Sequence, residues 1–277
     1  MALSLRTMLI FALFITPAIT YGQGLGDRPG DIRQGIRAEA ACAIAGMSAE
    51  QAQLTALQRA RAAAIEQAAG VSVTSASLVT NATLTGDFIK TYARGYIVRE
   101  KVEWLPLGQY QKDASTAPIP EYRVRITADV YCPERKPQGL RLRARLNAPV
   151  FRKGEKASIA VQANQEARVA IFNITADDQV VLLFPNAHAP EHLLPAGRDV
   201  IFPDKDAKVE LEMEPLPGHQ RDAEAFLICA WDRDQAIRIL ERFPEGKPLA
   251  FAAFFARLAE TAPEAETILP YEVVGTP

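Results

Sequence analysis

Residues 157–184, ASIAVQANQEARVAIFNITADDQVVLLF, contain three strand patterns separated by short turn signals. Apolar residues alternate with polar or small ones over residues 157–161 and again over residues 167–171, as expected of strands with one buried face. Residues 180–184 are continuously apolar, which indicates a strand buried on both faces. Short strands with little helix between them predict a sandwich of two antiparallel sheets.

The strand pattern continues on both sides of this stretch. Apolar residues alternate with arginines over residues 140–146, and residues 225–231 form a further apolar run. Phenylalanines recur at helical spacing over residues 249–260. We therefore predict an all-β, immunoglobulin-like sandwich domain with a C-terminal closing helix over residues 140–262. Residues 263–277 are rich in proline and glutamate, so we predict a flexible tail there.

The preceding residues predict a different architecture. SAEQ at residues 48–51 matches a capping box, which marks the start of a helix that ends at Gly70. Residues 96–104 and 122–130 then alternate between apolar and polar side chains, as half-buried strands do. We predict an α+β N-terminal domain over residues 36–132, in which one long helix packs on an antiparallel sheet.

The first residues predict export. Arg6 precedes an apolar run over residues 8–18, and Thr20 and Gly22 fit the −3 and −1 positions of a cleavage site. The run is shorter than the roughly 20 apolar residues that span a bilayer. We therefore expect residues 1–22 to be a cleaved signal peptide, with an uncleaved membrane anchor as the alternative. The mature chain is expected to lack a transmembrane helix and to be periplasmic, with outer-membrane association left open.

Two segments rich in glycine, proline and charged residues separate these parts. Residues 23–35 are predicted to form a flexible leader and residues 133–139 a linker. The formal net charge of the chain is −2, and its pI is about 6.0. A nucleic-acid-binding protein normally has a strong basic excess, so we expect no nucleic-acid partner.

The chain has three cysteines, and in an oxidising compartment two of them could pair. Cys42 and Cys132 lie near the start and at the end of the first predicted domain. We predict a possible disulfide between them, with free thiols as the alternative. Cys229 lies in the apolar run AFLICAW, where a buried thiol is expected.

One short segment has the residue types of a metal site. His188, Glu191 and His192 lie in AHAPEH and fit the H-x-x-E-H pattern of inverted zinc peptidases. That pattern requires a helix, which Pro190 would break. We prefer a solvated loop without metal, and keep as the alternative a metal-dependent or small-molecule-binding periplasmic enzyme that uses this loop.

Three arginines are expected on one face of a strand: Arg141, Arg143 and Arg145. Such a row could bind an acidic partner or an anionic lipid head group. Because rows of this kind are more often solvated or salt-bridged, we prefer that interpretation.

Several strings in the C-terminal half carry a family resemblance. These are Phe151 with the pair Gly154–Glu155, VAIFNITADDQV at residues 169–180, LLFPN at residues 182–186 and LLPAGRDVIFP at residues 193–203. Over residues 140–234 the chain resembles a bacterial family known as domain of unknown function 4384 (DUF4384). Members fused to kinase or peptidase modules imply an accessory role, with no catalytic residues and no cofactor.

The N-terminal half has a second resemblance. The helix and following residues 56–81, with ARGYIV at residues 93–98 and YRVRITADV at residues 122–130, are similar to the N-terminal domain of flagellar assembly protein T and to related envelope lipoproteins. This chain departs from the lipoproteins because it has no cysteine at the cleavage point. The resemblance implies a periplasmic or outer-membrane setting.

The sequence has neither the G-x-S-x-G motif of serine hydrolases nor the G-x-x-x-x-G-K-[ST] phosphate-binding loop. We therefore predict an exported, non-enzymatic envelope protein. Its expected role is binding, assembly or accessory interaction, and its expected partner is another envelope protein or envelope component.

Overall fold

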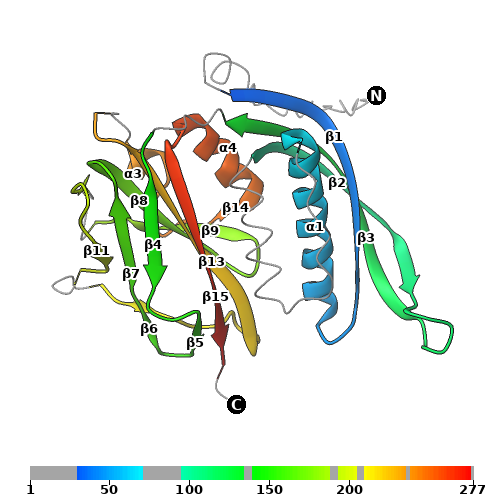
Figure 1. Cartoon of the computed structure of the whole chain (residues 1–277). Helices are drawn as coiled ribbons and strands as arrows, with labels where there is room; N and C mark the ends of the chain where they lie inside the picture. The colour runs from blue at the N-terminus through cyan, green and yellow to red at the C-terminus, as the bar shows by residue number, and fades with distance from the viewer. Residues whose placement is uncertain are drawn as a thin grey trace, which may run out of the picture.

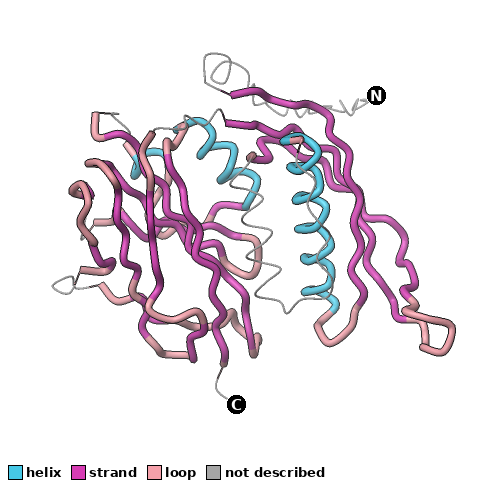
Figure 2. Tube along the Cα trace, in the orientation of Figure 1, coloured by secondary structure: helices cyan, strands magenta, loops and turns pink. Residues whose placement is uncertain are grey.

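The computed structural model describes residues 30–70, 95–133, 139–187, 193–204, 209–234 and 238–275. Figures 1 and 2 show a helix packed on a sheet, followed in the sequence by a larger β-rich half. Residues 1–22, predicted to be a signal peptide, and residues 134–138 of the predicted linker lie outside the described residues. Within the described part, no helix is both long and apolar enough to cross a membrane.

The N-terminal half contains one antiparallel sheet with the strand order β1–β3–β2, and α1 lies along one face of it (Figure 1). This confirms the predicted helix on an antiparallel sheet. The elements are β1 (Gly30–Ala43), α1 (Ala49–Ala69), β2 (Tyr96–Tyr110) and β3 (Ile119–Pro133).

The ends of α1 follow directly from the sequence. The Ser48 hydroxyl accepts a hydrogen bond from the Gln51 backbone N–H, and the Gln51 side chain accepts one from the Ser48 N–H. This capping box satisfies two of the free N–H groups at the start of the helix. At the other end Gly70 adopts a left-handed conformation with φ of 70°, which costs glycine little because it has no Cβ.

The buried side of α1 consists mainly of alanines. Five of them have no exposed surface: Ala52, Ala56, Ala60, Ala64 and Ala68. Such small side chains let the helix backbone approach the sheet closely. Leu54 and Leu57, in contrast, are only half-buried, and they lie where the N-terminal half meets the C-terminal half.

The C-terminal half is built from strands. The largest sheet has seven strands in the order β14–β9–β8–β13–β15–β5, with β10 beside β8. Its strands are β5 (Val150–Arg152), β8 (Ala167–Ile174), β9 (Gln179–Phe184), β10 (Leu193–Leu194), β13 (Arg221–Asp232), β14 (Leu249–Ala250) and β15 (Ala265–Val274).

Smaller elements complete this half. A three-stranded sheet has the order β11–β7–β4, and β12 pairs with β6. The elements are β4 (Leu142–Leu146), β6 (Lys156–Ala157), β7 (Ile159–Ala163), β11 (Val200–Phe202), β12 (Leu211–Glu212), α3 (Ile239–Arg242) and α4 (Phe251–Thr261).

Strand β13 separates two cores because its side chains alternate between the two faces of the sheet. Phe226 and Ile228 share a core with Ile159 and other residues of the three-stranded sheet. Leu227 and Trp231 belong to a second core, which includes α4 and extends into the N-terminal half. The seven-stranded sheet is thus covered by a sheet on one face and by helix on the other.

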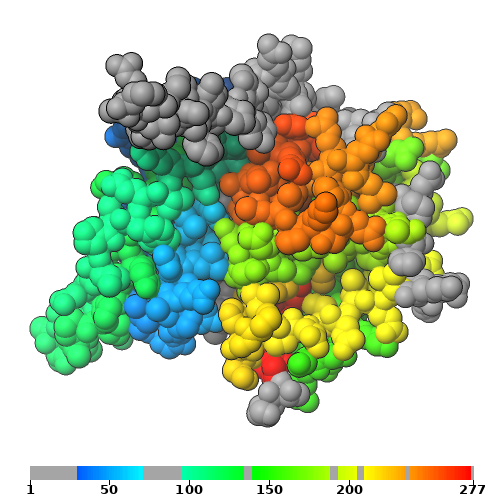
Figure 3. Space-filling view, turned by 180° about the vertical axis from the view of Figure 1, so that it is seen from behind, coloured from blue at the N-terminus to red at the C-terminus, as the bar shows by residue number. Residues whose placement is uncertain are grey.

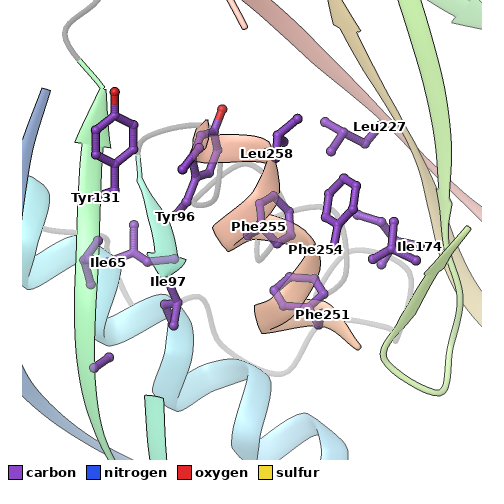
Figure 4. Packing of buried hydrophobic residues seen from close by; sticks show 14 of the residues in the cluster. Ile65, Tyr96, Ile97, Tyr131, Ile174, Leu227, Phe251, Phe254, Phe255 and Leu258 are labelled. Carbon is purple, nitrogen blue, oxygen red and sulfur yellow. The ribbon is translucent and has the colours of Figure 1, made fainter. Parts of the chain in front are cut away.

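The aromatic helix α4 joins the two halves (Figure 4). The rings of Phe254 and Phe172 are 4.8 Å apart, and those of Phe255 and Tyr96 are 5.5 Å apart. The Tyr96 hydroxyl also donates a hydrogen bond to Glu266 in β15. The predicted closing helix therefore lies between the halves, where its phenylalanines fill a core that both of them share.

The predicted flexible tail over residues 263–277 is wrong for most of its length. Residues 265–274 form β15, which pairs with β13 on one side and β5 on the other. Tyr271 and Val273 are 2 % and 1 % exposed. The high content of proline and glutamate suggested fraying, but partners distant in the sequence supply both the hydrogen bonds and the burial that order this segment.

The predicted flexible leader over residues 23–35 is also wrong at its end. β1 begins at Gly30 and pairs with β3 from Gly30↔Pro133 to Arg33↔Val130, before a bulge between Arg33 and Ile36. The glycines and charged residues of this segment tolerate a half-exposed edge strand, because β3 supplies the ladder hydrogen bonds.

Candidate functional site

A groove of about 400 Å³ lies where the two halves meet. Its apolar lining comes from three parts of the chain: Leu54 and Leu57 of α1, Trp104 of β2, and Leu216 and Pro217 of the loop before β13. Figure 3 shows the face of the molecule on which α1, in blue, approaches this loop, in yellow. Neither half alone would form the groove.

Trp104 supplies the aromatic surface of the groove. It lies opposite Val124 in the β2–β3 register, on the face of the sheet that α1 covers. Its ring contacts Tyr122 edge-on at 6.2 Å, which fixes one side of the indole. Even so, Trp104 remains 40 % exposed, so a large apolar surface is available at the groove.

The charged residues that line the groove are Glu50, Asp177 and His219. Glu50 lies in the first turn of α1, and Asp177 lies in the turn between β8 and β9. Both carboxylates are exposed, and neither forms a salt bridge within the described part of the chain. No lysine or arginine is among the described residues that line the groove, so its local charge is negative.

His219 is held by a buried carboxylate. Its Nδ1 lies 2.6 Å from Oδ1 of Asp222, which is 2 % exposed, and Oδ2 of Asp222 accepts the Leu216 N–H at 2.6 Å. The hydrogen bond to Asp222 raises the pKa of His219, and the charges of Asp222, Glu50 and Asp177 add to this effect. The hydrogen bonds of Asp222 therefore hold in place the loop before β13, which forms one wall of the groove, and they position the titratable His219 side chain at that wall.

A second hollow continues the groove past His219. It measures about 70 Å³ and extends to Arg221 and Glu272. The Arg221 guanidinium pairs with the nearly buried Glu272 carboxylate, so this cation is already engaged within the protein.

A buried ion cluster fixes the two walls of the groove relative to each other. Arg61 of α1 is 4 % exposed, and its guanidinium lies 2.7 Å from Glu100 in β2 and 2.6 Å from Asp178 in the β8–β9 turn. The same guanidinium lies over the Phe251 ring, 5.1 Å from its centre. Burial raises the pKa of Asp178 although the charge of Arg61 opposes this shift.

The predicted disulfide is not compatible with the structure. Cys42 lies opposite Tyr122 and Cys132 lies opposite Asp31 in the β1–β3 ladder. Along β3, the ten residue steps from Tyr122 to Cys132 span roughly 30 Å, whereas a disulfide needs Cα atoms within about 7 Å. Both cysteines lie near the C-terminal ends of antiparallel strands, which are opposite ends of the ladder.

The three cysteines are present as free thiols. Burial raises the pKa of the Cys42 and Cys132 thiols and raises that of Cys229 most strongly. Cys229 has no exposed surface, as predicted from its apolar run.

The predicted metal-type cluster His188, Glu191 and His192 lies outside the described residues. Among the residues that the structure describes, no group of three or more histidine, cysteine, aspartate or glutamate side chains could hold a metal ion. The loop hypothesis and its enzymatic alternative therefore stay predictions.

The arginine row lies on an exposed face. Arg143 and Arg145 point to solvent from β4, and the exposed Arg141 directly precedes this strand. Arg145 lies 2.7 Å from Asp199 in a salt bridge whose side chains are 72 % and 40 % exposed. The face is thus solvated, and binding of an acidic partner or lipid head group to it stays a prediction.

The groove residues were not predicted from the sequence. His219 and Asp222 have the H-x-x-D spacing of a local pair, and this was the only signal available for them. Trp104 was expected to be one of the apolar residues of a half-buried strand. Its position beside Leu216 depends on how the two halves pack, which no local pattern encodes.

Comparison with protein families shows a match in the C-terminal half. Residues 150–222 match the family model described as Domain of unknown function (DUF4384), which confirms the resemblance predicted for the C-terminal half. No curated protein matches the chain, and the resemblance of the N-terminal half to flagellar and lipoprotein domains is not shown. The matched segment contributes Asp177, Leu216 and His219 to the groove, whereas α1 and Trp104 lie outside it. The C-terminal half of this chain is thus similar, over residues 150–222, to the DUF4384 family.

Proposed function

We propose that this protein is an exported, non-enzymatic envelope protein that binds another envelope protein in the groove between its two halves. The observation that carries the proposal is the composition of that groove. Half-exposed Leu54 and Leu57 and the 40 % exposed Trp104 surround a hollow rimmed by charged side chains. Exposed apolar surface with a polar rim is typical of protein interaction sites.

The chemistry of the groove favours binding over catalysis. His219 and Asp222 could act as a base and the group that orients it, but covalent catalysis by such a pair also needs a nucleophilic side chain within hydrogen-bond reach. Among the described residues that line the groove and the adjoining hollow, the hydroxyl side chain is that of Thr55, and it donates its proton to the Gln51 carbonyl at 2.7 Å. It is therefore engaged by the helix backbone.

Export is supported by the order of residues 1–22, with a positive charge, an apolar run and then small residues. Sequencing the N-terminus of protein recovered from the periplasmic fraction tests this part, and we expect it to begin at Gln23. As part of the same proposal, the two packed sheets of the C-terminal half form an immunoglobulin-like sandwich, which the core shared by those sheets supports.

Capture from detergent-solubilised envelopes tests the binding role. The wild-type chain, Trp104→Ala and Leu107→Ala are immobilised in parallel, because Leu107 is 61 % exposed on the same strand but does not line the groove. We expect the wild type and Leu107→Ala to retain the same protein and Trp104→Ala to lose it. Equal retention by all three chains, or no retention by the wild type, would contradict the proposal.

A further inference from the structure

We propose that the groove binds a short peptide segment that contains both apolar side chains and lysine or arginine, supplied by the partner protein. This inference rests on the binding function proposed above and adds the chemistry of the segment that is bound.

The size of the groove favours a short segment. A volume of about 400 Å³ lies at the lower end of the range of ordinary ligand pockets. It can receive a few side chains but not a folded domain. The hollow of about 70 Å³ beyond His219 extends the same path along α1, as an elongated ligand requires.

Charge complementarity favours a basic segment. Glu50 and Asp177 lie on opposite walls of the groove, and both contribute to the electrostatic field at His219. The structure gives neither carboxylate a cationic partner among the described residues. A ligand with cationic side chains would therefore find two carboxylates that form no salt bridge within the described part of the chain, and an acidic ligand would be repelled.

The apolar lining of the groove favours apolar side chains in the bound segment. Leu54, Leu57 and Leu216 offer aliphatic surface on both walls, and Trp104 offers an exposed aromatic ring. Aliphatic side chains of the ligand would lose water contact against the leucines. A lysine or arginine could lie over the Trp104 ring, an arrangement in which the face of the indole attracts the cation.

Direct binding of model peptides tests this specificity. The probe is the fluorescein-labelled peptide Leu-Lys-Leu-Lys-Leu-Lys, and its fluorescence anisotropy is followed as the full chain is added. Two matched peptides carry glutamate in place of lysine or serine in place of leucine. We expect the first peptide to bind best and its affinity to fall as salt is added, because salt screens the attraction between exposed charges.

Variants of the protein locate the binding to the groove. Removing both carboxylates with Glu50→Gln and Asp177→Asn should weaken the leucine–lysine peptide about fivefold, on the scale of exposed ion pairs. Trp104→Ala should weaken both this peptide and the serine–lysine peptide. Glu241→Gln is the matched control, since this exposed carboxylate does not line the groove. This variant should bind the leucine–lysine peptide with the affinity of the wild type.

The possible results distinguish failure of the basic-segment proposal from failure of the proposed envelope-binding function. Equal binding of the glutamate peptide, or unchanged affinity in the double variant, would overturn the basic-segment proposal even if envelope capture still depends on Trp104. Self-association that Trp104→Ala abolishes, without peptide binding, would place a second copy of the chain in the groove and would also overturn it. Envelope capture that does not depend on Trp104 would instead remove the proposed function itself.

Discussion

Arg61 Nη1 lies 2.6 Å from Asp178 Oδ2 and so connects α1 of the N-terminal half to the β8–β9 turn of the C-terminal half. The side chains are only 5 % and 16 % exposed. Because Asp177, next to Asp178, lines the groove, this ion pair sets the distance between a groove wall and α1.

We expect Arg61→Met to lower the free energy of unfolding by about 3 kcal/mol. The substitution leaves Glu100 and Asp178 buried without their cation, and loss of one member of a buried ion pair typically costs this much. Urea denaturation followed by circular dichroism measures the change. Arg238→Met is the control, because the Arg238 side chain is 78 % exposed in its pair with Glu241. A loss below about 1 kcal/mol for Arg61→Met would show that the cluster does not hold the halves together.

We expect Glu224→Gln to be neutral or stabilising at neutral pH. Glu224 is 5 % exposed, and its carboxylate accepts hydrogen bonds from Tyr271 and Asn173 at 2.6 and 3.1 Å. Burial nevertheless raises its pKa above the ordinary value of 4.5.

The sign of the pH effect follows from proton linkage. Between the unfolded and the raised folded pKa, the native state binds more protons than the unfolded state, so stability falls as pH rises. Thermal denaturation of the wild type and Glu224→Gln should therefore show the wild type losing relative stability as pH rises above about 4.5. A wild type that gains relative stability over this range would contradict the assignment.

All three thiols should react after unfolding, with or without prior reduction. Cys42 and Cys132 lie at opposite ends of the β1–β3 ladder, too far apart for a bond between them. Titration with a thiol reagent in denaturant measures the number. Two fewer thiols in the unreduced sample, on a chain that migrates as a monomer, would contradict this strand register.

Deleting residues 263–277 should abolish cooperative folding. This truncation removes β15 from between β13 and β5 and exposes the cores that contain Tyr271 and Ile268. Deleting only residues 276–277 is the matched control and should leave the melting transition unchanged. If the chain without residues 263–277 melts at the same temperature as the full chain, residues 265–274 do not stabilise the fold and the segment is a flexible tail.

Binding of the leucine–lysine peptide should weaken as His219 becomes protonated. The pKa of His219 is raised above its ordinary value of 6.5 by Asp222 of β13, Glu50 of α1 and Asp177 of the β8–β9 turn. The other charged groups nearby are Arg221 and Glu272, which line the adjoining hollow. As pH falls through this raised pKa, the groove gains a positive charge that opposes a basic ligand.

The matched variant for this pH effect is His219→Gln, which removes the titrating group. Peptide anisotropy between about pH 6 and 8 should show a steeper loss of affinity for the wild type than for the variant. Parallel pH curves would show that His219 does not contribute to the charge of the groove.

Local features of the fold were predictable because each is encoded by neighbouring residues. The capping box at Ser48 and the left-handed Gly70 set the ends of α1, and clean alternation predicted β3 and the inward face of β8. Local signals were misleading where long-range pairing decides the structure. Pro270 and the glutamates suggested a frayed tail, yet β13 orders it as β15.

The candidate site could not be predicted for the same physical reason. Trp104 and Leu216 lie far apart in the sequence and line one groove only because α4 and the Arg61 cluster fix the two halves together. The predicted disulfide between Cys42 and Cys132 was wrong because it was based on their positions along the chain, whereas the directions of β1 and β3 determine which of their residues lie side by side.

Photo-crosslinking in intact cells tests whether the groove is where the chain binds an envelope protein. A photoreactive benzoylphenylalanine replaces Gln53, which lines the groove, and in a second strain it replaces Lys112, exposed beyond the end of β2. After illumination, mass spectrometry identifies the proteins joined to the chain. We expect one defined envelope protein to be joined at position 53 and not at position 112. Crosslinks at position 112 alone, or none at position 53, would contradict it.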